Sequence, residues 1–156
     1  MSQHTATIKW RAGEGDFARG RYSREHTWTC DGGMTLNASS SPSVVPVPMS
    51  NPAYIDPEEA FVASLSSCHM LTFLFLAMRK GFTVASYDDE AVGTMSKNER
   101  GTPWISTVVL HPKVVYAGDE RPTPEEEHEL HEGAHRDCFI SQSVKTDVRV
   151  EPAAAG

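Results

Sequence analysis

The stretch that decides the fold is Asp56-Pro-Glu-Glu-Ala-Phe-Val-Ala-Ser-Leu-Ser-Ser-Cys68, which runs on through His69-Met-Leu-Thr-Phe-Leu-Phe-Leu-Ala-Met78. Asp56 is a favourable N-cap, Pro57 suits the first helical position, and Glu59 is placed to complete a capping box. Gly81 is a typical residue just beyond a helix end. These signals predict a long helix over about residues 57–80.

The second half of this helix, residues 70–78, carries apolar side chains on every face. A helix of that kind is expected to be buried around its whole circumference. A membrane span is the alternative, but serines, His69 and Thr72 interrupt the apolar run below the roughly 20 residues that a bilayer requires. The pattern therefore favours the central helix of a globular protein, with no membrane partner.

The segment before the helix, residues 1–50, is predicted to be mostly β. Strands are expected at 5–11 and 21–30, and the turn Asp31-Gly32-Gly33 allows residues 34–38 to return as a partner strand. In the second strand His26, Trp28 and Cys30 share one face, where Cys30 is expected to serve as packing. The Pro/Ser-rich stretch that follows is incompatible with a helix.

The segment after the helix is predicted to contain three more elements. A long hairpin spans residues 87–116, a capped surface helix covers 124–137, and a strand closes the chain at 144–151. Residues 1–156 contain no repeat or long linker, so we expect a single α+β domain with an antiparallel sheet packed on a long buried central helix.

The chain has 156 residues with 14 basic and 21 acidic side chains, a formal charge of −7. A nucleic-acid partner is excluded because no basic stripe is available to neutralise phosphates. The N-terminus lacks the pattern of an export signal, and three widely spaced cysteines do not form a secreted disulfide framework. We therefore expect a cytoplasmic protein whose cysteines are buried, catalytic or metal-bound.

Two cysteine motifs resemble those of the OsmC/Ohr family of osmotically inducible and organic hydroperoxide resistance proteins. Residues 56–68 resemble the family's "NPEEL…A…C" signature, and Cys138-Phe-Ile-Ser-Gln-Ser resembles its second motif of Cys, two residues and Ser. The separation of the cysteines and the order of elements also agree. The sequence departs from the pattern at His69-Met70, where an aromatic residue is usual, and at Phe139, where Pro is usual.

The resemblance implies an intertwined homodimer with an OsmC-like fold that reduces organic hydroperoxides through a two-cysteine cycle, without a cofactor. By motif, Cys68 is the expected peroxidatic cysteine, Cys138 the resolving cysteine and Glu58 the active-site glutamate. The family's arginine in the N-terminal β segment is assigned to Arg24 in preference to Arg19 and Arg21. The implied reductant is a dithiol such as a lipoyl group, although no residue distinguishes it from thioredoxin.

The residue types suit this chemistry. A thiolate attacks the peroxide, a nearby guanidinium stabilises the anion, and a carboxylate fixes the guanidinium by a bidentate contact. Cys138 then traps the sulfenic acid as a disulfide before it is oxidised further. An apolar wall that would favour alkyl peroxides is expected from the following residues: Phe61, Leu65, Leu71 and Phe73.

Helix geometry separates Glu58 from Cys68. Ten residues of continuous helix place their backbones about 15 Å apart along the axis. Either the helix begins later than expected, or Glu58 acts with the cysteine of a second subunit.

Three other features or interpretations of the sequence compete with a two-cysteine peroxidase. His131-Glu132-Gly133-Ala134-His135 matches the HExxH pattern of zinc hydrolases, and His128 lies on the same face, but charged flanking residues favour a solvated helix. A non-catalytic ligand-binding member of the same fold is a second alternative. Gly13 to Ala18 resembles a dinucleotide fingerprint, yet no helix follows it, so a glycine-rich turn is expected.

Overall fold

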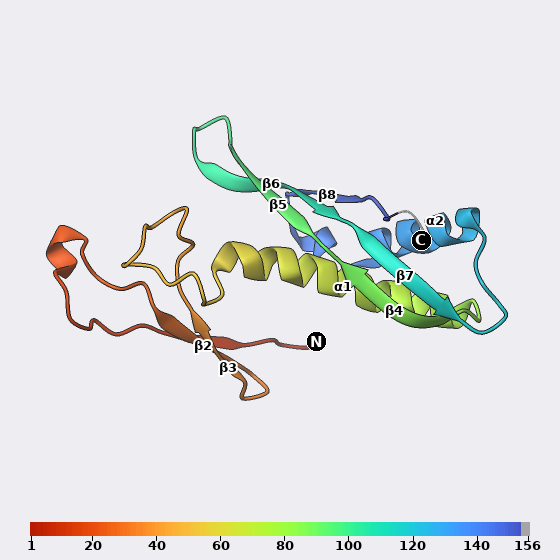
Figure 1. Ribbon diagram of the computed structural model, residues 1–156, viewed down its shortest axis with the longest axis horizontal. Helices are drawn as coiled ribbons and strands as arrows, with labels where there is room; N and C mark the ends of the chain where they lie inside the picture. The colour runs from red at the N-terminus through yellow and green to blue at the C-terminus, as the bar shows by residue number, and fades with distance from the viewer. Residues whose placement is uncertain (154–156) are drawn as a thin grey trace. The chain divides into compact units, whose positions relative to one another are not determined.

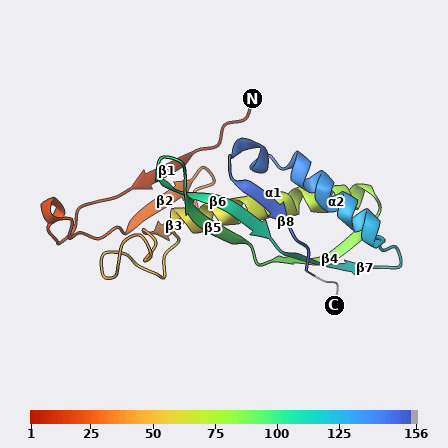
Figure 2. The ribbon, with the colours of Figure 1, turned by 90° about the horizontal axis from the view of Figure 1, so that it is seen from above.

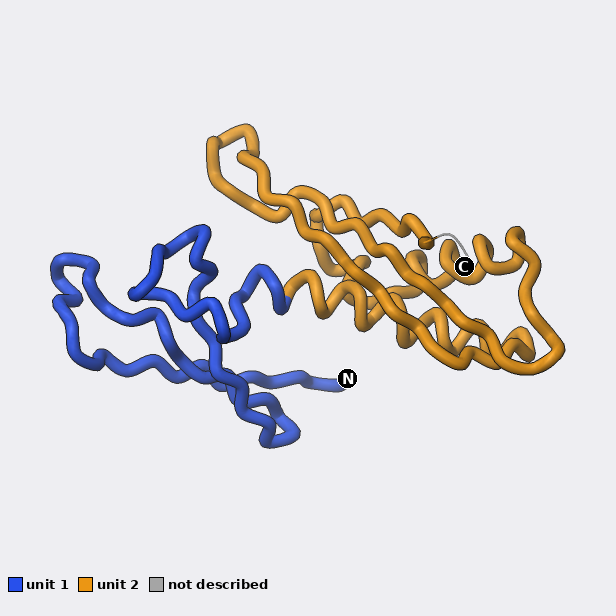
Figure 3. Tube along the Cα trace, in the orientation of Figure 1, with its two compact units in different colours: residues 1–60 blue, residues 61–156 orange. Residues whose placement is uncertain are grey.

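The computed structural model describes residues 1–153 and contains two α-helices, eight β-strands and two short 3-10 helices in this region (Figure 1). The Cα trace divides into two compact units, residues 1–60 and residues from Phe61 onward (Figure 3). The first unit is a three-stranded sheet with its loops. The second unit contains most of the first helix, the whole of the second helix and the other strands.

The sheet of the first unit has the order β1-β2-β3 and is antiparallel throughout. Its strands are β1 (Ala6–Lys9), β2 (His26–Cys30) and β3 (Thr35–Ala38), with a 3-10 helix at Phe17–Arg19. The expected turn between β2 and β3 is present. The strand predicted over 21–30 is shorter than expected, because β2 begins only at His26.

Helix α1 spans Pro57–Arg79, as the capping signals predict. The backbone N–H of Glu59 donates to Asp56 Oδ1 at 2.7 Å, and the N–H of Asp56 donates to Glu59 Oε2 at 3.1 Å, which completes the capping box. Gly81 follows the helix at a φ of 86°, in the left-handed region that favours glycine. By length and composition α1 could cross a membrane, a test that the core helix of a globular protein also passes.

One expectation for α1 is wrong for the single chain: the helix is not buried on all sides. Leu65, His69, Phe73 and Ala77, spaced four residues apart, are buried. The opposite face carries Leu71, Phe75 and Met78, which are 61%, 52% and 60% exposed. The reason is geometric, since the strands and α2 of the second unit cover only one side of the helix.

The second unit contains two sheets. Strands β4 (Thr83–Asp89) and β7 (Pro112–Ala117) form an antiparallel pair, and β5 (Val92–Lys97), β6 (Pro103–Leu110) and β8 (Asp147–Val150) form a three-stranded sheet. The predicted hairpin is therefore correct, but it begins at Thr83 and each arm is divided into two strands. The strand pairs are antiparallel as expected, except that β8 pairs with β6 in parallel.

Helix α2 (Pro124–Asp137) lies beside α1, as the two ribbon views show (Figures 1 and 2). Leu130 and Ala134 of α2 form a buried cluster with Phe73 and Ala77 of α1. A second cluster joins Leu65 to Val108 and Leu110 of β6. The capping box predicted for α2 is present at Thr123 and Glu126, but the helix is not entirely a surface helix, because one face packs into the core.

Candidate active site

The structure brings the two motif cysteines together. Cys68 lies midway along α1, whereas Cys138 directly follows α2 as its C-cap residue. Both thiols are free. Cys138 is fully buried and its Sγ accepts a hydrogen bond from the N–H of Ser141 at 3.4 Å, while Cys68 is partly exposed. A molecule that arrives from solvent therefore meets Cys68 first, with Cys138 behind it.

The surroundings of Cys68 favour the protonated thiol. Burial raises its pKa above the usual value, and the neighbouring Cys138 thiol raises the pKa further. The backbone N–H groups of Ile140 and Phe139 act in the opposite direction, since they stabilise the anion. Within residues 1–153 no cationic side chain contributes to lowering the pKa of this thiol. The second unit thus holds a cysteine pair without the positive charge that would activate it.

A groove of about 510 Å³ in the first unit holds the other two expected site residues, Arg24 and Glu58. Its apolar wall is an aromatic cluster of Trp10, Phe17 and Tyr22, whose ring centroids are 4.5 to 5.8 Å apart. The Arg24 guanidinium lies 3.6 Å from the centroid of the Tyr22 ring. The lining of the groove contains a cation, a carboxylate and aromatic rings, but no thiol.

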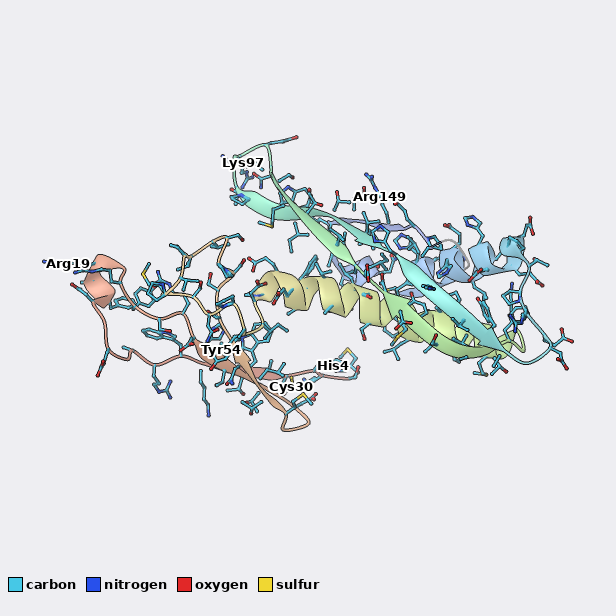
Figure 4. The ribbon with its side chains drawn as sticks, in the orientation of Figure 1. His4, Arg19, Cys30, Tyr54, Lys97 and Arg149 are labelled. Carbon is cyan, nitrogen blue, oxygen red and sulfur yellow. The ribbon has the colours of Figure 1, made fainter. Side chains whose placement is uncertain are left out.

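Arg24 is the only one of the three candidate arginines that lines this groove. Arg19 and Arg21 instead form ion pairs with Asp16 at 3.4 and 3.6 Å, and their side chains are 74% and 65% exposed. Figure 4 shows Arg19 at the outer tip of its loop. The expected bidentate contact between Glu58 and Arg24 is not formed among residues 1–153, where the Arg24 Nη1 donates to the carbonyl oxygens of Gly20 and Tyr22.

The apolar wall expected from α1 is wrong. Leu65 and Phe73 are fully buried in two separate core clusters, whereas Leu71 is exposed on the opposite face. Phe61 lines a different groove, beside Trp104. Leu71 does not share a helix face with Leu65 and Phe73, which follow the four-residue spacing of the buried face.

Comparison with known proteins assigns the chain to a family. The family model described as OsmC-like protein matches residues 50–153. The chain belongs to the OsmC-like family. Among curated proteins, no sequence matches it significantly.

Solved structures of OsmC-like proteins share the fold. An OsmC-like protein of unknown function from Vibrio cholerae is 48% identical, with a TM-score of 0.95 over 98% of this chain and 100% of the other. An organic hydroperoxide resistance protein from Elizabethkingia anophelis is 19% identical, with a TM-score of 0.72 over 100% and 97% of the two chains. That of Bacillus subtilis is 20% identical, with a TM-score of 0.65 over 96% and 98%. These similarities confirm the predicted α+β, OsmC-like fold.

The zinc alternative is not supported in this OsmC-like protein. His131 is 3% exposed, contrary to the solvated face expected for it, and its Nδ1 lies 3.1 Å from His69 Nε2 of α1. Among the residues described, no group of three or more His, Cys, Asp or Glu side chains is arranged to hold a metal ion. The HExxH pattern here contributes to helix packing.

Two residues that line the groove, His26 and Trp10, were not predicted as site residues, and Cys30 lies in a different environment from the one expected. His26 lines the groove with Arg24, and a signal was available in the alternation that places His26 and Trp28 on one face of a strand. Trp10 also belongs to the groove's aromatic wall. Cys30 was expected to pack, but it is exposed at the end of β2 (Figure 4).

Proposed function

We propose that this OsmC-like protein is a thiol-dependent peroxidase that reduces organic hydroperoxides through a disulfide cycle between Cys68 and Cys138. The observation that carries the proposal is that the partly exposed Cys68 of α1 lies next to the buried, free Cys138 at the end of α2. Two relatives named as organic hydroperoxide resistance proteins share the fold. A reducing, cytoplasmic compartment suits the free thiols.

The cycle balances in three steps. The Cys68 thiolate attacks one peroxide oxygen, the O–O bond breaks, and the departing alkoxide takes up a proton and leaves as an alcohol, so that Cys68 becomes a sulfenic acid. The Cys138 thiol then attacks the sulfenic sulfur, forming a disulfide and releasing water. An external dithiol, such as a lipoyl group, reduces the disulfide and is itself oxidised to a disulfide.

We further propose that the working enzyme is a homodimer in which each site combines residues of both subunits. In the part of the chain that the structure describes, no cationic side chain lowers the pKa of Cys68, and the groove of the first unit is lined by Arg24 and Glu58 but by no thiol. Along α1, Glu58 and Cys68 are ten residues apart, which is about 15 Å. A second subunit resolves this separation, because its Arg24 and Glu58 can approach the first subunit's Cys68.

The uncovered apolar face of α1 is consistent with such a dimer. Leu71, Phe75 and Met78 are exposed on one face of a helix whose other face is already in the core, and the Arg79 guanidinium lies 5.8 Å from the centroid of the Phe75 ring at the end of this face. Exposed apolar patches of this kind mark interaction surfaces. We assign this patch to a second copy of the chain, because a composite site needs that copy as well.

The aromatic wall of the groove supports an organic substrate. Trp10, Phe17 and Tyr22 offer apolar contact to the carbon chain of a hydroperoxide, while Arg24 offers a positive charge to the oxygen atoms. Hydrogen peroxide has no apolar part and gains nothing from this wall. We therefore expect higher kcat/KM for alkyl and aralkyl hydroperoxides than for hydrogen peroxide.

The decisive experiment measures consumption of an alkyl hydroperoxide by the reduced protein with a dithiol, and compares wild type with Cys68→Ser and Cys30→Ser. Cys68→Ser should be inactive, whereas Cys30→Ser should keep the wild-type rate. Intact mass after one equivalent of peroxide should fall by two hydrogens, as for a disulfide. An unchanged mass would identify a non-catalytic ligand-binding protein, and full activity of Cys68→Ser would refute the mechanism.

A further inference from the structure

A chain of two hydrogen bonds in the first unit leads from Trp28 through His26 to the backbone of Arg24. The indole Nε1 of Trp28 donates to His26 Nε2 at 2.8 Å, and His26 Nδ1 lies 2.7 Å from the carbonyl oxygen of Arg24. An indole nitrogen can only donate, and a carbonyl oxygen can only accept. The partners therefore fix His26 as the neutral tautomer that carries its proton on Nδ1.

Both backbone polar groups of Arg24 form hydrogen bonds. Its N–H donates to the carbonyl oxygen of Met49 at 2.8 Å, and its C=O accepts from His26. The guanidinium is held at the same time, since Nη1 donates to the carbonyl oxygens of Gly20 and Tyr22 and the group lies over the Tyr22 ring. Arg24 lies in the loop just before β2, where no strand partner fixes its backbone.

We propose that His26 is a positioning residue for Arg24: its Nδ1–H holds the Arg24 carbonyl and thereby aims the guanidinium into the groove, and Trp28 selects the tautomer that can do so. The inference rests on the proposed function only where activity is measured. His26 acts through Arg24 and needs no contact of its own with the reacting atoms. A shift of about 1 Å in the guanidinium would be costly, because misplacement of a catalytic group by that distance can reduce a rate about a hundredfold.

Two variants separate the two hydrogen bonds of His26. His26→Asn places an amide N–H near the position of Nδ1, so it can still donate to the Arg24 carbonyl but no longer reaches Trp28. His26→Gln places an amide oxygen near the position of Nε2, so it can accept from Trp28 but leaves the Arg24 carbonyl without its donor. Each variant loses one hydrogen bond, which makes the pair a matched comparison.

We expect His26→Gln to lower kcat/KM with an alkyl hydroperoxide by about tenfold or more and His26→Asn by less than about threefold, with similar urea midpoints for both. In an Arg24→Lys background the same His26→Gln change should have little further effect. Equal losses in the two variants, or losses that follow the urea midpoint, would show that His26 is only structural and would overturn the inference.

A readout independent of activity keeps this test separate from the proposed function. ¹⁵N NMR of the wild type, at a pH where imidazole is neutral, should show His26 protonated at Nδ1 and unprotonated at Nε2. The N–H protons of the Arg24 guanidinium should exchange with water at least about tenfold faster in His26→Gln than in His26→Asn. An inactive wild type with these NMR results would refute the peroxidase alone, whereas the opposite tautomer, or equal exchange in both variants, would refute the role of His26.

Discussion

The imidazole rings of His69 and His131 are stacked in the core of the second unit, with Nε2 of His69 and Nδ1 of His131 3.1 Å apart and the ring planes inclined by 8°. His131 also stacks on Phe73. His69 adjoins Cys68 on α1, and α2 runs from His131 towards Cys138. The pair therefore joins the two helices that carry the cysteines.

The histidine pair should make the protein sensitive to acid. The pKa of both His69 and His131 is lowered to about 4, first by burial and then by nearby imidazoles, His135 for the first and His69 for the second. In the unfolded chain the pKa of histidine is about 6.5, so below that pH the unfolded state binds more protons and stability falls as pH falls. Between pH 6.5 and 5 each ring should cost about 1.5 kcal/mol of unfolding free energy.

Urea unfolding at pH 6.5 and pH 5 measures this loss. His131→Gln removes one titrating ring and should roughly halve the difference between the two pH values. His4→Gln, a change at an exposed histidine, should leave the difference unchanged. Equal pH dependence in wild type and His131→Gln would contradict the assignment.

Cys138→Ser should separate the two halves of the catalytic cycle. The first turnover should survive because Cys68 is still present, but without the buried thiol the sulfenic acid should persist or advance to sulfinic acid. A dimedone adduct on Cys68, detected by peptide mass spectrometry, measures the trapped species. Normal multiple turnover in this variant would show that Cys30 or an external thiol resolves the intermediate.

Arg24→Lys should reduce kcat/KM about a hundredfold, because a compact ammonium cannot reproduce the guanidinium's fixed donors above Tyr22. Arg19→Lys is the matched control, since Arg19 is exposed and paired with Asp16, and it should keep the wild-type rate. If the site is composite as proposed, the rate of Cys68 alkylation by iodoacetamide should also fall in the Arg24→Lys variant. The opposite pattern in the two variants would move the active-site arginine to Arg19.

Phe73 and Phe75 are two residues apart on α1 and should respond in opposite ways. Phe73 is fully buried, so Phe73→Ala should cost about 3–5 kcal/mol of unfolding free energy. Phe75 is 52% exposed, so Phe75→Glu should leave the fold intact and convert the proposed dimer into a monomer in sedimentation experiments. Val115→Glu, at an exposed position on β7, is the control that should remain dimeric.

Complementation tests the composite site directly. Glu58→Ala and Cys68→Ser proteins, once each is shown to be nearly inactive, are refolded together. If a site combines Glu58 of one subunit with Cys68 of the other, each heterodimer has one intact site, and roughly a quarter of wild-type activity should return with random pairing. No activity should return if each site lies within one chain.

Much of the local structure could be predicted because it depends on residues close in sequence. The capping boxes at Asp56 and Thr123 join groups three residues apart, and both formed as expected. The alternation of side chains within β2 and the glycine turn after it were enough to predict the hairpin of β2 and β3. The family's two cysteine motifs were also recognisable, because each is a short run of residues around a cysteine.

The sequence by itself thus determined where the helices begin, the family and the α+β fold, whereas only the tertiary structure decided which faces are buried. Because α1 is apolar on every side, its sequence does not predict that Phe73 is buried and Phe75 exposed. That depends on strands and a helix that are distant in sequence. The same holds for the parallel pairing of β8, for the burial of His131 and for Arg24's place in the groove. The physical reason is that capping is a local hydrogen bond, while burial is a property of two surfaces that meet only after the chain has folded.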